Sequence, residues 1–388
     1  MSLPAFCRAW LLLCCSLLAA PAMAAQKWVV GPAGTPMSLQ QALERAQDGD
    51  VIELLSGDYR GQPLLLDQRR LTLRGVGARP VFNGERKVGP TRALWTVRGG
   101  DVTVENVEFR GARSQGAEGA GIRQEGGLLT VRDSAFYDNE HGLLALNDER
   151  AEVRIERTQF GAAPHVAGQL YHLLNVGRIG KLSVQGSRFQ QGFEGHMIKS
   201  RARETSIAYN FIHDGNTGGA SYEIDLPVGG MATVIGNIIG QSPKAQNRVM
   251  VAYGAEGSVW PKNALHLAHN TLLNGLATPA WFLRIWRDKL PPDTQVLAVN
   301  NLLVGPGVFW LGAPGHFQGN HPATFGMLAD SATYAFELPP DSVWRGRASD
   351  PRNVQGVDLS PKAEFTFPMG TTPLAPGRSS WSPGAFQK

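Results

Sequence analysis

The most regular feature of the chain is a short pattern of alternating apolar and polar residues. Segments such as VTVENVEF (102–109), LTVRDSAF (129–136) and TVIGNII (233–239) show two alternating apolar residues, a small or Asn residue, and another apolar position. Alternation with a period of two predicts β-strands, because successive side chains of a strand point to opposite faces. The pattern occurs eight times between residues 102 and 304, so we expect many short strands.

The pattern returns at nearly regular intervals, and single residue types return with it. The first four segments end in Phe and the last four carry an Asn at one place: Phe109, Phe136, Phe160, Phe189, Asn210, Asn237, Asn270 and Asn301. Within each set the steps are 24 to 33 residues, which predicts a solenoid whose coils contribute two or three strands each. A β-sandwich would not repeat one residue type in every unit. We therefore expect the asparagines to stack as an internal ladder at a corner.

The beginning and the end of the chain fit a solenoid as well. The run SLQQALERAQDGDVIELLSGDYRG (38–61) predicts a Ser N-cap, an amphipathic helix, a DG turn and a strand. Such a helix would cover the apolar end of the first coil. Residues 313–388 are rich in Pro and Gly, and we expect them to form an extended tail packed on the solenoid rather than a second domain.

These features resemble a known superfamily. The run ALERAQDGDVIELLSGDYRG and the Asn-bearing coils resemble secreted right-handed parallel β-helix proteins of the pectate-lyase-like superfamily, over roughly residues 28 to 310. The resemblance implies an all-β fold, a single-stranded right-handed parallel β-helix with an N-terminal capping helix. We expect the β-helix to occupy residues 26–312.

The first 25 residues predict a secretory signal peptide. Arg8 is followed by the apolar run WLLLCCSLLAA and by the small-x-small site Ala22-Met23-Ala24, so we expect a periplasmic or secreted protein. All three cysteines fall in this segment. The mature chain then has no thiol, which excludes disulfides and cysteine–zinc sites.

Composition and motifs exclude several other classes. The chain has 37 Lys and Arg against 33 Asp and Glu, a balance too slight to indicate nucleic acid. No later apolar run is long enough to span a membrane. No G-x-G-x-x-G, HxH or HExxH pattern occurs, so neither a nucleotide nor zinc is expected. We expect a monomer.

The candidate chemistry lies on a second strand of each middle coil. In SYEIDL (221–226), Glu223 and Asp225 alternate with apolar residues and should project together, about 7 Å apart. Aligning the apolar residues of successive coils as inward-pointing gives two outward columns. One contains Asn175, Lys199, Asp225, Ala252 and Trp286, and the other contains Leu173, Met197, Glu223, Met250 and Arg284.

These columns predict one patch on an open face. Adjacent coils are about 4.8 Å apart, which brings Lys199, Glu223, Asp225, Arg284 and Trp286 together. Trp can stack on a sugar ring, Arg can pair with a carboxylate and Lys can accept a proton, as an anionic sugar chain would require. The plainer alternative is a surface ion pair between Lys199 and Asp225. The clustering in the middle coils favours a site.

The segment EGHMIKSRARETSIAYNFIHDG, within residues 194–241, is similar in layout to polysaccharide lyase family six, which comprises alginate lyases and chondroitinase B. The resemblance implies that Lys199, in IKS, is the Brønsted base. That family continues with LRHG, whose Arg assists catalysis, whereas this chain has IDLP, with Asp225 in the place of the Arg. Arg201, Arg203 and Arg284 are the candidates to replace that cation.

The leading prediction is therefore a lyase that cleaves a uronate-containing polysaccharide by β-elimination. Arg284, or a Ca²⁺ held by Glu223 and Asp225, would neutralise the substrate carboxylate. His196 or Tyr253 would be the auxiliary acid. The expected substrate-binding residues are Trp286, Arg201, Arg203, Asn175 and His213. The alternatives are a glycoside hydrolase using Glu223 and Asp225, an epimerase, and a non-catalytic carbohydrate-binding β-helix.

Overall fold

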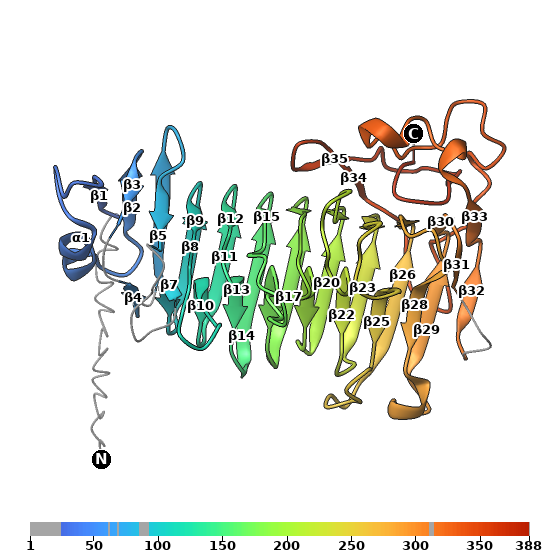
Figure 1. Ribbon diagram of the computed structural model, residues 1–388, viewed down its shortest axis with the longest axis horizontal. Coiled ribbons are helices and arrows are strands. Elements are labelled where there is room, and N and C mark those ends of the chain that lie inside the picture. The colour runs from blue at the N-terminus through green and yellow to red at the C-terminus, as the bar shows by residue number, and fades with distance from the viewer. Residues whose placement is uncertain (1–24, 61–62, 68–69, 85–92, 310–313, 388) are drawn as a thin grey trace, which may run out of the picture.

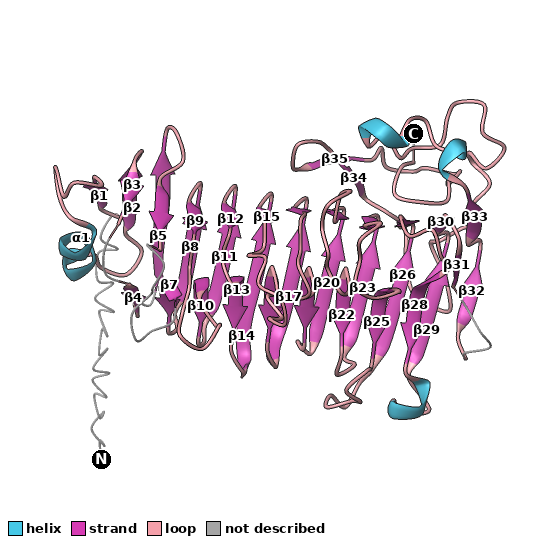
Figure 2. Ribbon diagram, in the orientation of Figure 1, coloured by secondary structure: helices cyan, strands magenta, loops and turns pink. Residues whose placement is uncertain are grey.

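The protein is a long right-handed parallel β-solenoid (Figure 1). The computed structural model describes residues 25–60, 63–67, 70–84, 93–309 and 314–387. The predicted signal peptide, residues 1–25, lies outside the described residues except for Ala25. Strands dominate the described chain and one α-helix accompanies them (Figure 2), which confirms the predicted all-β fold. None of the described helices has the length and apolar character of a membrane span.

Each coil passes through three sheets in the same order, and every strand pairs in parallel with the equivalent strand of the next coil. Sheet A contains β1 Lys27–Val30, β2 Val51–Leu55, β5 Arg70–Val76, β8 Asp101–Glu105, β11 Leu128–Arg132, β14 Asp148–Glu156, β17 Ile179–Gln185, β20 Glu204–Ala208, β23 Met231–Ile235, β26 Ala264–Ala268, β29 Gln295–Val299 and β32 His316–Gln318. Sheet B contains β3 Asp58–Tyr59, β6 Val81–Asn83, β9 Glu108–Arg110, β12 Ala135–Tyr137, β15 Gln159–Gly161, β18 Arg188–Phe189, β21 Phe211–His213, β24 Ile238–Gln241, β27 Thr271–Asn274, β30 Leu302–Val304 and β33 His321–Ala323. Sheet C contains β4 Leu64–Leu66, β7 Ala93–Val97, β10 Ala120–Gln124, β13 His141–Ala145, β16 Leu174–Val176, β19 Ile198–Ser200, β22 Ile224–Leu226, β25 Val249–Tyr253, β28 Ala280–Ile285 and β31 Gly307–Val308.

A capped helix begins the solenoid, as predicted. Helix α1, Leu39–Arg45, lies beside β1 at the N-terminal end (Figure 1). The Ser38 hydroxyl accepts a hydrogen bond from the Gln41 N–H at 3.2 Å, and the Gln41 side chain accepts one from the Ser38 N–H at 3.1 Å. This reciprocal capping box satisfies two N–H groups that a helix start leaves unpaired.

The predicted asparagine ladder forms the corner between sheets A and B. The Asn237 N–H donates to Oδ1 of Asn270 at 3.0 Å, and the Asn237 amide donates to the Ile207 carbonyl at 2.9 Å. Asn320 continues the ladder beyond the four predicted residues, because its Oδ1 accepts from the Asn301 N–H at 3.1 Å. The residue before each rung has a positive φ, such as 68° at Gly236, which turns the chain sharply into the next sheet.

Stacked aromatic rings fill the interior of the first coils. The predicted Phe positions 109, 136, 160 and 189 lie face to face, with centroids 4.7 to 5.0 Å apart, and all four side chains are buried. Offset stacking of this kind adds to the free energy gained by burying apolar area. The repeat in the sequence therefore has a direct packing cause.

The solenoid runs past the expected boundary at residue 312, because β32 and β33 extend it to Ala323. The rest of the tail contains η2 Phe325–Met327, η3 Ser331–Thr333 and the antiparallel pair β34 Ala363–Phe365 and β35 Thr371–Pro373. It lies along the C-terminal half of the solenoid (Figure 1), where Phe336 and Phe365 pack in one buried cluster with Phe211 and Ile238 of sheet B. The tail is thus joined to the side of the solenoid by an apolar contact.

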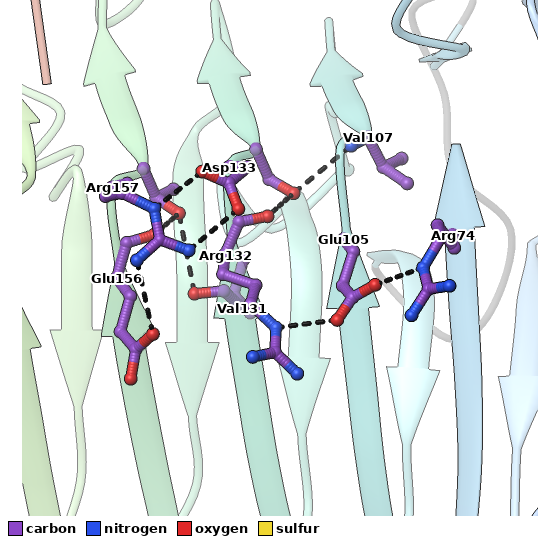
Figure 3. Close-up of polar contacts among 10 residues, drawn as sticks. Arg74, Glu105, Val107, Val131, Arg132, Asp133, Glu156 and Arg157 are labelled. Atoms are coloured by element: carbon purple, nitrogen blue, oxygen red, sulfur yellow. Dashed lines mark hydrogen bonds and ion pairs between the residues drawn. The ribbon is translucent and has the colours of Figure 1, made fainter. Parts of the chain in front are cut away.

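Charged residues on sheet A pair across neighbouring coils (Figure 3). Glu105 contacts both Arg74 and Arg132, and the Arg157 guanidinium makes two hydrogen bonds, of 2.8 and 2.9 Å, with the Asp133 carboxylate. Exposed pairs of this kind contribute little to stability. Each of these charges already has a partner among the described residues.

Candidate active site

The register of sheet C brings a line of polar residues onto its outer face. Asn175 pairs with Lys199, Lys199 with Asp225, Asp225 with Ala252, and Ala252 with Arg284. The first four residues of this line match the predicted column, but the fifth is Arg284, where Trp286 was predicted. Val251 pairs with Leu283 rather than Ile285, and since both are apolar with the same parity, alternation alone does not distinguish the two registers.

Lys199 lies at the centre of the candidate site. Its Nζ is 3.4 Å from Oδ2 of Asp225 and 3.6 Å from Oε1 of Glu256. The Lys199 side chain is 13% exposed, whereas that of Asp225 is 4% exposed, so Lys199 is the more accessible of the two residues. Burial raises the pKa of Asp225 to about 6, against the opposing effect of Lys199. Asp225 is thus a buried anchor for the amine.

His196 contacts the same oxygen of Asp225 as Lys199 does. Its Nε2 lies 3.3 Å from Oδ2 of Asp225, and its ring stacks between those of His172 and Tyr222, with centroids 4.8 and 4.7 Å away. The backbone N–H of His196 donates to Nδ1 of His172. The His172 imidazole therefore carries its proton on Nε2. Burial lowers the pKa of His196 to about 3, so the ring is neutral. The predicted auxiliary acid therefore faces Asp225 and positions it.

A carboxylate already lies between two cations at this site. The Arg201 Nη2 is 2.6 Å and its Nε 3.0 Å from the two oxygens of Glu256, and Lys199 is the second cation. Burial raises the pKa of Glu256, but the hydrogen bonds and charge of Arg201 outweigh burial and lower it. Glu256 is therefore ionised, and the pair of cations holds a carboxylate on the outer face of the sheet.

The loop after β25 carries Glu256 back over the earlier coils. Gly254 and Gly257 adopt φ of 80° and 97°, and the Glu256 N–H donates to the Pro227 carbonyl at 2.7 Å. Trp260, further along the loop, donates from Nε1 to the Arg201 carbonyl at 3.1 Å. The pairing of Arg201 with Glu256 joins residues 55 apart in the sequence, which no strand pattern indicates.

Glu223 does not share a face with Asp225, and this expectation was wrong. The chain bends at Glu223, one residue before β22 begins, so the alternation is interrupted there. Glu223 is fully buried in the inward column of Met197 and Met250, and neither of its oxygens has a hydrogen-bond partner among the described residues. Burial raises its pKa well above the usual range, and Asp214 adds to the effect.

The position of Glu223 does not fit the two predicted uses of the acid pair, a hydrolase pair and a calcium site. A hydrolase needs both carboxyl groups to flank one bond, and a Ca²⁺ site needs both to reach one ion. Glu223 points inward while Asp225 is held by Lys199 and His196. In the described ranges, no group of three or more His, Cys, Asp or Glu side chains is placed to hold a metal ion. These residues therefore do not fit the predicted calcium site.

Three other predicted site residues lie elsewhere. Tyr253 is fully buried and its hydroxyl donates to the Gly230 carbonyl at 2.6 Å, so it is unavailable as an acid. Arg203 lies after β19, with its guanidinium 5.9 Å from the Trp260 ring centroid. His213 ends β21 of sheet B and stacks on Phe336 of the tail rather than beside Lys199. The alternation of the strand could have shown that Tyr253 points inward. The contact of His213 with the tail could not be predicted, because the tail has no repeated sequence pattern.

Arg284 and Trp286 lie together at the C-terminal side of the same face. The Arg284 guanidinium is 4.6 Å from the Trp286 ring centroid and 5.8 Å from that of Trp281. Arg284 is three strands away from Lys199 in the register of sheet C. Arg284 is therefore too distant to share one carboxylate with Lys199, whereas Arg201 and Lys199 both contact Glu256.

The whole structure is similar to a solved lyase. Pectate lyase Pel9A superimposes with a TM-score of 0.67 over 95% of this chain and 98% of that one, at 14% sequence identity. The fold is a pectate-lyase-like β-helix. A variant of the PL6 family alginate lyase AlyGC matches 77% of this chain and 40% of its own, with a TM-score of 0.44 and 17% identity. No family model matches the chain, and no curated protein matches it.

Proposed function

We propose that the protein is an exported lyase that cleaves a uronate-containing polysaccharide by β-elimination, with Lys199 as the proton acceptor and Arg201 as the neutralising cation. The observation that carries the proposal is the Glu256 carboxylate, held by Arg201 and Lys199 on the outer face of sheet C. A carboxylate is the group by which a uronate differs from a neutral sugar. The side chain of Glu256 therefore marks where a substrate carboxylate would bind.

The chemistry follows from this placement. The two N–H groups that Arg201 now directs at Glu256 would pair with the substrate carboxylate, and neutralising it makes the proton on the adjacent carbon more acidic. Lys199, the second cation at Glu256, must first lose a proton, and its free amine then accepts the proton of the substrate. The electron pair left behind forms a carbon–carbon double bond, and the glycosidic bond to the next carbon breaks. The leaving oxygen takes a proton from the Lys199 ammonium, which restores the amine.

Asp225 and His196 support this reaction without contacting substrate. Asp225 fixes the Lys199 amine through the 3.4 Å contact, and neutral His196 fixes Asp225. A base held in one position reacts more readily than a mobile one, since the ordering is completed before the reaction. Both are therefore positioning residues.

The experiment that tests the proposal follows two products at once. The mature protein is incubated with alginate, pectate, chondroitin, hyaluronan and a neutral glucan, with and without chelator. Ultraviolet absorbance of unsaturated uronate and reducing ends should rise together for one anionic polymer. Reducing ends without absorbance would show hydrolysis and overturn the proposal. Loss of activity in chelator would show that a cation shares the role assigned to Arg201.

A substrate carboxylate must displace Glu256, and this gives a further prediction. Glu256→Gln removes the competing charge, so the KM for the charged polymer should fall by about two- to fivefold, as expected for a partly exposed ion pair. Steady-state kinetics measure the change, with Glu204→Gln, an exposed change on sheet A, as the control. An increase in KM would instead show that Glu256 is needed to orient Arg201.

A further inference from the structure

Arg284 is a cation without a counter-ion on the face that carries Lys199. Among the described residues Arg284 forms no ion pair, whereas Arg201 is paired with Glu256 and the arginines in Figure 3 are paired with acids. The Arg284 side chain is exposed, and its guanidinium lies over the rings of Trp286 and Trp281. Such cation–π contacts hold a guanidinium in place and leave its N–H edge free for a ligand.

The position of Arg284 relates it to Lys199. Both residues project from the outward column of sheet C, with Asp225 and Ala252 between them. Three strand steps of about 4.8 Å put the two residues roughly 14 Å apart along the solenoid axis. Asp225 and Ala252 are 3% and 0% exposed, so neither presents a free charge or a bulky group to a ligand that passes over them. A linear polymer that lies along the axis would therefore pass from one cation to the other.

We propose that Arg284, Trp281 and Trp286 form a remote subsite that binds the carboxylate and the ring of a second sugar unit of the same polyuronate chain. The inference rests on the proposed function and extends it. Arg284 would pair with the carboxylate through two parallel N–H bonds, and an indole would cover the apolar face of the sugar. The substrate then runs from Lys199 toward the C-terminal coils, and only chains long enough to reach both cations gain the added affinity.

The structure contains a matched control for this proposal. Arg123 pairs with Leu144, Leu144 with Asn175, and Asn175 with Lys199, so Arg123 lies in the same column three strands away in the N-terminal direction. Arg123 is already neutralised by Glu125, whose Oε1 is 3.1 Å from its Nε. The two arginines are equally distant from Lys199 in strand steps, and only Arg284 has no acidic partner.

The test measures kcat/KM for uronate oligomers from dimers to octamers in the unmodified protein, Arg284→Ala and Arg123→Ala. Arg284→Ala should lower kcat/KM for the octamer by at least about tenfold and leave the dimer unchanged, as expected for loss of a charge-assisted contact. Arg123→Ala should change neither. An equal loss at all lengths, no loss at all, or a larger loss in Arg123→Ala would each overturn the proposal.

A binding measurement separates this inference from the proposed function. The same oligomers are titrated by calorimetry into the same variants that also carry Lys199→Met, which suppresses turnover. Weaker octamer binding in Arg284→Ala, with Arg284→Lys intermediate, would support the subsite even if the polymer is not cleaved. Cleavage with unchanged octamer affinity in Arg284→Ala would leave the lyase function standing and reject the subsite.

Discussion

Replacing Lys199 by Met is expected to reduce β-elimination by about 10²- to 10⁴-fold, the usual contribution of a general base. Met keeps the apolar stem of Lys and removes the amine that would accept the proton. Initial rates followed by ultraviolet absorbance measure the loss, and oligomer titration should show that binding persists through Arg201. Retention of more than roughly a tenth of the activity would assign the base to another group.

The change also leaves Asp225 without its main cation, so a stability control is needed. An unpaired buried carboxylate is costly, and Lys199→Met alone should unfold at a lower temperature. The double variant Lys199→Met with Asp225→Asn removes the stranded charge and should recover stability without recovering activity. Since burial raises the pKa of Asp225 to about 6, activity of the unmodified protein should fall as pH drops below that value and the anchor of Lys199 loses its charge.

Replacing Glu223 by Met is expected to stabilise the protein above about pH 6. The folded state raises the pKa of Glu223 well above its unfolded value of about 4.3. The contribution of Glu223 to the free energy of unfolding is therefore fully present below that unfolded pKa. It falls by roughly 1.4 kcal/mol for each pH unit above it, until the folded pKa is reached. Met removes the titration and matches Met197 and Met250, which occupy the same column in the adjacent coils.

Thermal unfolding at about pH 6.5 and about pH 8 tests this expectation, with a gain of several degrees for Glu223→Met at the higher pH. This pH window excludes most of the contribution of Asp214 and Asp225, whose pKa values burial raises only to about 6. Glu223→Gln should give a smaller gain, because an unpaired buried amide remains costly. The melting temperature could instead fall equally between the two pH values in the unmodified protein, Glu223→Met and Glu223→Gln. That result would refute a buried, protonated Glu223.

The repetitive parts of the structure could be predicted from the sequence, and the reasons are physical. The asparagine ladder and the Phe stack repeat one contact in every coil, so the same residue type recurs at the same place. The capping helix begins at Ser38 because its sequence contains both halves of a capping box. Lys199 and Asp225 were correctly placed side by side, since parallel pairing transmits the register from coil to coil.

The errors arose where the chain departs from the repeat. A bend at Glu223 turns the carboxyl inward, and alternation cannot register a bend. Leu283 and Ile285 are equally apolar, so the strand has two possible registers. The predicted register was the wrong one, and it placed Arg284 and Trp286 in the wrong columns. The contact of Arg201 with Glu256 depends on a loop that returns across two coils. The bend and the loop are irregular backbone, which no periodic pattern encodes, and the two registers have the same periodic pattern.

The C-terminal tail changes how the solenoid should come apart. Coils that contact only their neighbours form a one-dimensional array that can unfold from an end, one coil at a time. Here Gly370 donates to the Gly186 carbonyl at 2.9 Å, the Lys362 N–H to the Tyr209 hydroxyl at 2.7 Å, and Gly384 to the Asn300 carbonyl at 2.8 Å. One late segment thus fastens coils from residue 186 to residue 300, and these coils lose the freedom to open separately. The coils before β17 keep that freedom, while those that carry the reacting groups unfold as one block.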